Sequence, residues 1–245
     1  MIGIYELIVL WLSVILALAV GSVCLYKSYF RRYFVLNLYL LANTAFTLVG
    51  YYVYSIYGYD STEAFYFYYI GDAIPNIVGY LLIGSFFDRM LRESIFHRYV
   101  RPTLVIFFLL VVVISGVFVS GSTDRALVFP LFVIEFEQNM YFVGVLLTFL
   151  LWISMTYLRA ESRRFVLLVS GLGIYFSAHA ANYALHFLTP ALENVLIKVP
   201  PLAYTFMVLL WLYTFWRVPE AEEAVAPAAR AGPEEALVKV QISRQ

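Results

Sequence analysis

Seven long apolar runs determine what this chain can fold into. A bilayer core about 30 Å thick needs roughly 20 apolar residues of helix to cross it, because every backbone N–H and C=O must be paired inside the segment. Of the 245 residues, 63% are hydrophobic and 13% are charged, which leaves too little polar surface for a water-soluble globule. The sequence therefore predicts an all-α polytopic membrane protein. Its seven expected transmembrane helices cover residues 2–26, 33–57, 64–87, 103–120, 128–158, 165–188 and 191–216.

The lysines and arginines predict the orientation of these helices. With the exceptions of Arg125 and Lys198, all of them follow the first, third, fifth or seventh run. Cytoplasmic loops hold an excess of basic residues, so we expect the N-terminus outside and the C-terminus in the cytoplasm of a multi-pass protein of the inner (plasma) membrane. No basic residue precedes the first run, so we expect it to remain as a helix instead of being cleaved as a signal peptide.

Composition divides the chain into two parts near residue 218. Residues 1–217 form the expected seven-helix transmembrane domain. From residue 218 to residue 245 alanine, proline, glycine and glutamate predominate, and such a segment cannot bury enough apolar surface to fold alone. We therefore expect a disordered cytoplasmic tail. An enzymatic output domain does not fit into it, so a signal would have to pass through a cytoplasmic or membrane protein partner.

Polar side chains inside the runs indicate where a site would lie. A strongly polar side chain costs a few kcal/mol inside a membrane and usually faces the bundle interior. In the run 165–188, Tyr175, His179, Asn182 and His186 recur at steps of four, three and four, which places them on one helical face. Together with polar groups of other runs at similar depth they give the predicted ligand-binding set: Tyr51, Tyr69, Asp72, Asn76, Glu137, His179, Asn182 and Lys198.

The outer half of the expected bundle is acidic, since its carboxylates outnumber the two cations Arg125 and Lys198. This charge favours an outward-facing pocket for a small polar ligand that is cationic or forms hydrogen bonds. The alternative is a purely structural role, in which Asp72 pairs with Lys198 and His179 bonds to an asparagine or tyrosine to fix helix packing. Lys198 could also extend to the outer interface, where it would have no special role.

The residue types present argue against several kinds of chemistry. Cys24 is the single cysteine, so one chain can form neither a disulfide nor a cysteine-based metal site. His179 and His186 are separated by about 10.5 Å of helical rise, which is too far for one metal to bind both easily. A net charge of zero and a pI of about 6.8 offer no attraction for nucleic acid. The sequence predicts no cofactor, no metal and no catalytic residue, and it favours a binding protein over an enzyme.

Two further alternatives depend on the same residues. A retinal protein would attach its chromophore to Lys198 opposite Asp72, and an intramembrane hydrolase would use Asp72 with His179 as its base. No serine-containing motif accompanies the second pair. The tryptophans avoid the third and sixth runs, where a microbial rhodopsin packs aromatic walls around the chromophore; they are Trp11, Trp152, Trp211 and Trp216.

The third run carries an aromatic stretch and ends in a short charged segment. Residues 65–69 read Phe-Tyr-Phe-Tyr-Tyr and precede Asp72, and residues 87–89 and 96–98 read Phe-Asp-Arg and Phe-His-Arg. In these features the chain resembles a family of uncharacterised bacterial seven-span integral membrane proteins, over the second to fourth runs. The resemblance implies the seven-span fold and no particular activity. The chain is also broadly similar to the seven-span sensor modules of bacterial receptors, but it lacks their attached output domain.

Taken together, these features predict a sensor- or receptor-like seven-helix protein that binds a small ligand. One alternative is a small-molecule or proton-coupled transporter in which Asp72 and His179 titrate. Another is a structural membrane subunit that a protein partner completes. The lipid bilayer is the expected surrounding in every case.

Overall fold

The computed structural model describes residues 4–58, 61–92, 94–121, 128–158, 162–188, 196 and 198–219, and the regular secondary structure within them is entirely helical. The side chains of Glu6, Asp72, Leu158, Phe187 and Leu188 lie outside this description. The expected tail after residue 219 lies outside it as well. Seven helices are described: α1 (Ile4–Tyr26), α2 (Phe34–Tyr57), α3 (Thr62–Met90), α4 (His97–Ser120), α5 (Val128–Leu158), α6 (Arg163–Leu188) and α8 (Val199–Arg217).

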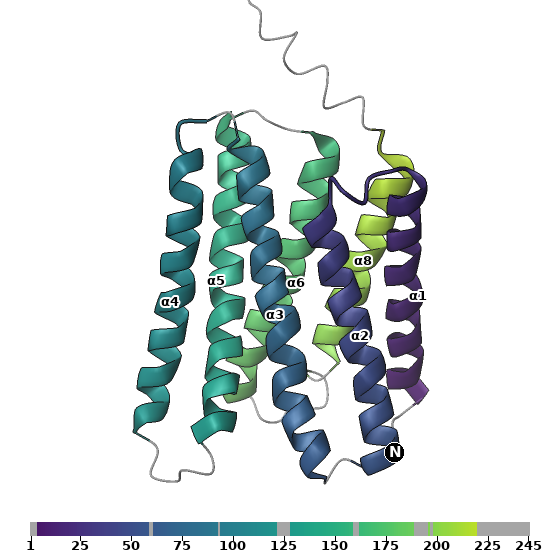
Figure 1. Cartoon of the computed structure of the whole chain (residues 1–245), viewed down its shortest axis with the longest axis vertical. Coiled ribbons are helices and arrows are strands. Elements are labelled where there is room, and N and C mark those ends of the chain that lie inside the picture. The colour runs from purple at the N-terminus through teal and green to yellow at the C-terminus, as the bar shows by residue number, and fades with distance from the viewer. Residues whose placement is uncertain are drawn as a thin grey trace, which may run out of the picture.

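The helices stand side by side and alternate in direction along the chain (Figure 1). We call the end where α1 begins the N-terminal end. We call the opposite end, where α8 finishes beside Lys27 and Arg164, the basic end. All seven helices are long and apolar enough to cross a membrane, so the prediction of a helical membrane bundle is confirmed in these terms. The orientation of the bundle remains a prediction.

Six of the helices form a closed ring. Neighbours in contact are α1 and α2, α2 and α3, α3 and α5, α5 and α6, α6 and α8, and finally α8 and α1. Helix α4 lies outside the ring against α5 and α3, at the edge of the molecule in Figure 1. Its contribution to the buried hydrophobic core is Val111, and most of its apolar side chains are exposed. This placement agrees with the long stretch without polar residues in α4, which suits a surface that faces lipid.

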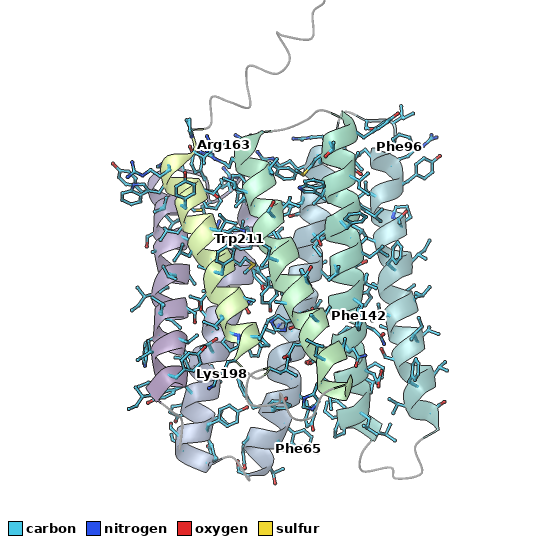
Figure 2. The ribbon with its side chains drawn as sticks, turned by 180° about the vertical axis from the view of Figure 1, so that it is seen from behind. Phe65, Phe96, Phe142, Arg163, Lys198 and Trp211 are labelled. Atoms are coloured by element: carbon cyan, nitrogen blue, oxygen red, sulfur yellow. The ribbon has the colours of Figure 1, made fainter. Side chains whose placement is uncertain are left out.

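Aromatic side chains fill the interior of the ring. Trp211 of α8 is fully buried in the middle of the bundle, and its indole N–H donates to the carbonyl of Leu168 at 3.0 Å (Figure 2). Gly171 allows this approach, since a Cβ there would stand 3.0 Å from the indole nitrogen. Gly144 of α5 similarly makes room for the ring of Phe176 on α6. Small residues at such crossings let membrane helices pack closely.

Two prolines of α8 lie at a different position in their helix from the one that the sequence suggested. The expected span of residues 191–216 would place Pro200 and Pro201 inside a helix, where each removes a backbone hydrogen bond. The described helix α8 instead begins at Val199, so both prolines lie in its first turn, where the backbone N–H groups have no partner inside the helix. Pro75, in contrast, lies inside the continuous helix α3.

Candidate functional site

A carboxylate and an imidazole are held between α5 and α6 by two tyrosines. The Tyr183 hydroxyl of α6 donates to Oε2 of Glu137 on α5 at 3.1 Å. One turn further along α5, the ring of Tyr141 stacks on His179, with centroids 4.2 Å apart and planes 15° apart. Helices α5 and α6 are antiparallel, so four residues forward on α5 correspond to four residues back on α6. The two contacts therefore lie one helical turn apart along the same interface.

Asn76 connects α3 to the same place. Its side chain is buried, and its Nδ2 donates to the backbone carbonyl of Glu137 at 3.4 Å. Glu137 is itself buried, nine residues after the start of α5. At 1.5 Å per residue that is about 14 Å inside the N-terminal end of the helix. We call Asn76, Glu137, Tyr141, His179 and Tyr183 the Glu137 group.

Three further tyrosines border this group. Tyr175 lies one turn from His179 on α6, and their rings are 4.5 Å apart. Tyr39 of α2 and Tyr204 of α8 meet the Tyr175 ring edge-on at 6.4 and 6.0 Å. Helices α2, α3, α5, α6 and α8 therefore all supply polar or aromatic side chains to one region of the ring interior.

Several buried side-chain oxygens of these helices have no hydrogen-bond partner among the described residues, the hydroxyls of Tyr39 and Tyr204 included. The Oδ1 atoms of Asn76 and Asn182 are both buried, and no donor within the described residues reaches either of them. The Glu137 carboxylate is a third acceptor, engaged by Tyr183. A buried acceptor without a donor is costly and calls for a ligand, a water or an ion.

The remaining predicted residues lie in other surroundings. Lys198 is exposed at the start of α8 (Figure 2), with its ammonium 5.5 Å from the ring centre of Tyr5 on α1. Tyr51 packs edge-on against Trp11 of α1 at 6.2 Å. Tyr69 packs against Phe65 and Phe129 instead, with ring centres 4.9 and 6.5 Å away. The expected pairing of Asp72 with Lys198 falls outside the described residues, because the Asp72 side chain does so.

The sequence prediction omitted Tyr183 and Tyr141 from the site. Tyr183 follows His179 by four residues, so the helical step that selected Asn182 and His186 could also have selected it. Tyr141 follows Glu137 by the same step. The sequence therefore contained both signals. An aromatic residue in a membrane helix more often has a packing role than a binding role, and spacing alone does not distinguish these roles.

A second buried polar group lies at the basic end. Arg164 is 1% exposed, and its Nη2 donates to the carbonyl of Val218 at 2.5 Å and to the Tyr29 hydroxyl at 3.4 Å. Lys27 donates to the carbonyls of Phe215 and Trp216 at 2.8 and 3.1 Å. These cations therefore engage the C-terminal carbonyls of α8. We call Lys27, Tyr29 and Arg164, with these carbonyls, the Arg164 group.

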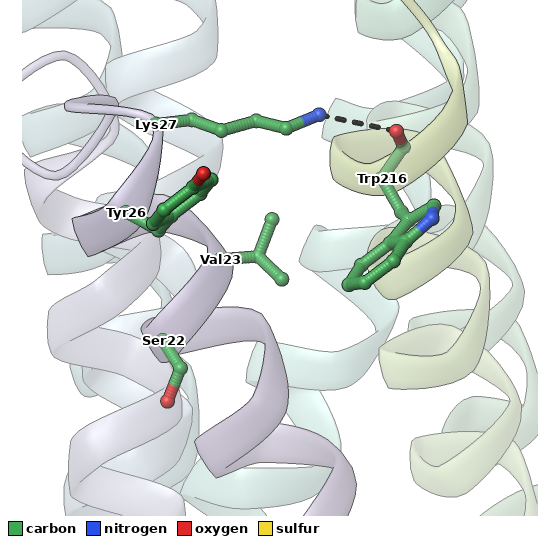
Figure 3. A pocket seen from close by; sticks show the side chains of 5 residues that line it. All are labelled: Ser22, Val23, Tyr26, Lys27 and Trp216. Atoms are coloured by element: carbon green, nitrogen blue, oxygen red, sulfur yellow. Dashed lines mark hydrogen bonds between the residues drawn. The ribbon is translucent and has the colours of Figure 1, made fainter.

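A hollow of about 450 Å³ opens beside Lys27, between α1 and α8 (Figure 3). Its lining is almost wholly apolar apart from the ammonium. It lies at the basic end, away from the Glu137 group. The residues that line it are Ser22, Val23, Tyr26, Lys27 and Trp216.

The Glu137 group can accept hydrogen bonds and can bind a positively charged group. Within the described residues no set of three or more histidine, cysteine, aspartate or glutamate side chains is placed to hold a metal ion. Tyrosine rings add negative faces that attract cations. Compared with known proteins, the chain matches no family model, no curated protein and no solved structure.

Proposed function

We propose that this multi-pass membrane bundle is a receptor-like protein that binds a small ligand carrying a positive charge and hydrogen-bond donors. The ligand enters from the N-terminal end and rests against Glu137, Asn76 and Asn182. The observation that carries the proposal is a pair of buried amide oxygens, Oδ1 of Asn76 and Oδ1 of Asn182, that have no donor in the described part of the chain; the Asn76 side chain also bonds to the backbone of the buried Glu137. A ligand that donates N–H groups would satisfy the two amide oxygens, and its positive charge would lie near the Glu137 carboxylate.

The aromatic surroundings favour the same ligand chemistry. A cation over a tyrosine face gains about 0.5–2 kcal/mol, more when water is excluded. Tyr141 and Tyr175 pack against His179, and Tyr141 also packs against Tyr183, which bonds to Glu137. A protonated amine would therefore find a carboxylate, amide oxygens and ring faces within one region.

The distribution of basic residues supports the direction of binding. If the basic end faces the cytoplasm of a cell with an inner membrane, the Glu137 group faces the outside. A bound ligand would bridge α3, α5 and α6 and so change how these helices pack. We infer that a protein partner at the basic end receives this change.

A thermal-shift experiment tests the proposal on the full chain in detergent. The probes, each tested separately, are a primary amine, a guanidinium compound and a polyamine, all of which are cations that donate N–H groups. We expect at least one of them to raise the unfolding temperature of the wild type and to leave that of Glu137→Gln unchanged. Glu135→Gln, two residues away on another face of α5, should respond like the wild type. The proposal is wrong if no amine shifts the wild type or if Glu137→Gln responds equally.

A proton-coupled transporter is the second candidate, and one observation favours it. Glu137 and His179 are both titratable, and Tyr183 and Tyr141 link them, with ring centres 5.8 Å apart. The sequence prediction assigned proton coupling to Asp72 with His179. Flux into liposomes that depends on a pH gradient would support a transporter. Loss of that flux in Glu137→Gln but not in Asp72→Asn would identify Glu137 as the coupling carboxylate.

A further inference from the structure

The hollow between α1 and α8 opens away from the interior of the ring. Tyr26 is 90% exposed and Trp216 is 63% exposed, and Ser22 is exposed as well. Val23 alone of the lining residues is buried, at the base of the hollow. A protein that crosses a membrane on these helices would present this opening to lipid chains.

The hollow lies at the depth of a membrane interface. Tyrosine and tryptophan prefer the headgroup region, where the ring is buried and its polar atom stays hydrated. Tyr26 is the last residue of α1, and Trp216 is the penultimate residue of α8. Both rings flank the hollow in Figure 3, and Lys27 extends across its top toward α8.

Lys27 brings a positive charge that no acidic side chain among the described residues offsets. Its described partners are two backbone carbonyls of α8, which occupy two of its three N–H donors. The third donor is left for another acceptor. An apolar hollow with a cationic rim at this depth matches a lipid in two respects, because an acyl chain fits the walls and a phosphate fits the ammonium.

We propose that the hollow is a binding site for one anionic phospholipid, with an acyl chain between α1 and α8 and the phosphate on Lys27. The volume of about 450 Å³ falls within the range of small-molecule sites. Basic pockets between membrane helices on the cytoplasmic side bind anionic headgroups in this manner. This site lies at the opposite end from the Glu137 group, so it does not depend on the proposed receptor function.

Trp216 provides the reporter for a test on the full chain in detergent micelles. Phospholipids with brominated acyl chains quench a tryptophan that they touch. The quenching of Trp216 is the difference between the wild type and Trp216→Phe. We expect brominated phosphatidylglycerol to quench it at about fivefold lower concentration than brominated phosphatidylcholine, since one lysine adds about that factor to the binding of an anionic lipid. Equal quenching by both lipids, or none by either, overturns the proposal.

Two variants separate the charge from the hollow. Lys27→Gln should lose the preference for phosphatidylglycerol, whereas Arg101→Gln, an exposed cation at the same end, should keep it. Ser22→Phe fills the hollow, retains Lys27 and adds no tryptophan, so it should weaken the Trp216 quenching by both lipids. A preference that persists in Lys27→Gln contradicts the assignment of the phosphate.

A soluble competitor distinguishes a lipid from a free anion. Inorganic phosphate in large excess should not relieve the quenching by brominated phosphatidylglycerol, because it lacks the chain that fills the hollow. Full relief would assign the site to a free phosphate and overturn the lipid proposal.

Discussion

The two buried polar groups of the bundle differ in what holds them. The Arg164 group consists of cations that donate to backbone carbonyls at the end of α8. The Glu137 group contains a carboxylate and an imidazole that meet tyrosine side chains from a neighbouring helix, and an amide that donates to a backbone carbonyl. One group has N–H donors in excess, since Nε and Nη1 of Arg164 have no acceptor in the described part of the chain. The other contains the buried Oδ1 of Asn76, which has no donor in the described part of the chain.

This difference indicates a structural role for the Arg164 group and a binding role for the Glu137 group. The last carbonyls of a helix carry the negative end of its dipole and always need donors or cations. Lys27 and Arg164 meet that need and join α8 to α1 and α6. Side-chain contacts such as the Tyr183 hydrogen bond can be exchanged for contacts with a ligand without breaking a helix. The predictions below therefore assign stability mainly to the first group and ligand response to the second.

The largest loss of stability is expected for Arg164→Ala. It removes charge-assisted hydrogen bonds to Val218 and Tyr29 and leaves a cavity, so the free energy of unfolding should fall by about 3 kcal/mol. SDS titration of the protein in mild detergent micelles measures this quantity. Arg163→Ala, the exposed neighbour, serves as the control. A loss no larger than that of the control would contradict the structural role.

Gly144→Ala tests the register that aligns the two contacts of the Glu137 group. Its new Cβ would overlap the ring of Phe176, so α5 and α6 should move apart at a cost of about 2 kcal/mol. We expect the amine response to fall as well. Gly116→Ala of α4 has no heavy atom within 4 Å of the added Cβ and should be neutral or stabilising. If Gly144→Ala and Gly116→Ala had the same stability in the SDS titration, close packing of α5 against α6 at Gly144 would be excluded.

Tyr183→Phe removes the hydroxyl that donates to Glu137 and keeps the ring. We expect a loss of about 1 kcal/mol, the value of an ordinary hydrogen bond, together with a changed response to amines. Tyr157→Phe, at an exposed position of α5, provides the control in both assays. Unchanged stability with an unchanged amine response would remove Tyr183 from the site.

The smallest effect on stability is expected for His179→Phe. A phenyl ring can retain the stack on Tyr141, so the free energy of unfolding should change by less than about 0.5 kcal/mol. The ring nitrogens are lost, and we expect the amine response to weaken. A destabilisation as large as that of Arg164→Ala would show that the imidazole is structural and would abolish the contrast between the two groups.

The helices were predictable from the sequence because membrane helices are defined by local composition. The expected ends at Tyr26, Tyr57, Ser120 and Leu188 coincide with the observed ends. The start of α4 was not predicted, because the expected apolar run begins at residue 103, after Pro102. The observed helix begins at His97, whose side chain bonds to Asp88 of α3 at 3.0 Å. Such a tertiary contact has no signature in local composition.

The candidate site was predictable only in part. Helical spacing singled out His179, and expected membrane depth added Asn76 and Glu137. Neither signal could determine which residues of other helices they meet. The ring order of the helices decides that, and it brings α5 next to α6 and leaves Lys198 beside α1. The burial of Arg164 was not predicted, since the charged head of an arginine near the end of a membrane helix is normally expected to extend into water.

The position of α4 outside the closed ring has a consequence for mutational tolerance. Because the other six helices enclose the core without it, its outer surface can change freely as long as each replacement is soluble in hydrocarbon. Labels, bulky apolar residues and fused partners are therefore best attached there, where they leave both polar groups undisturbed.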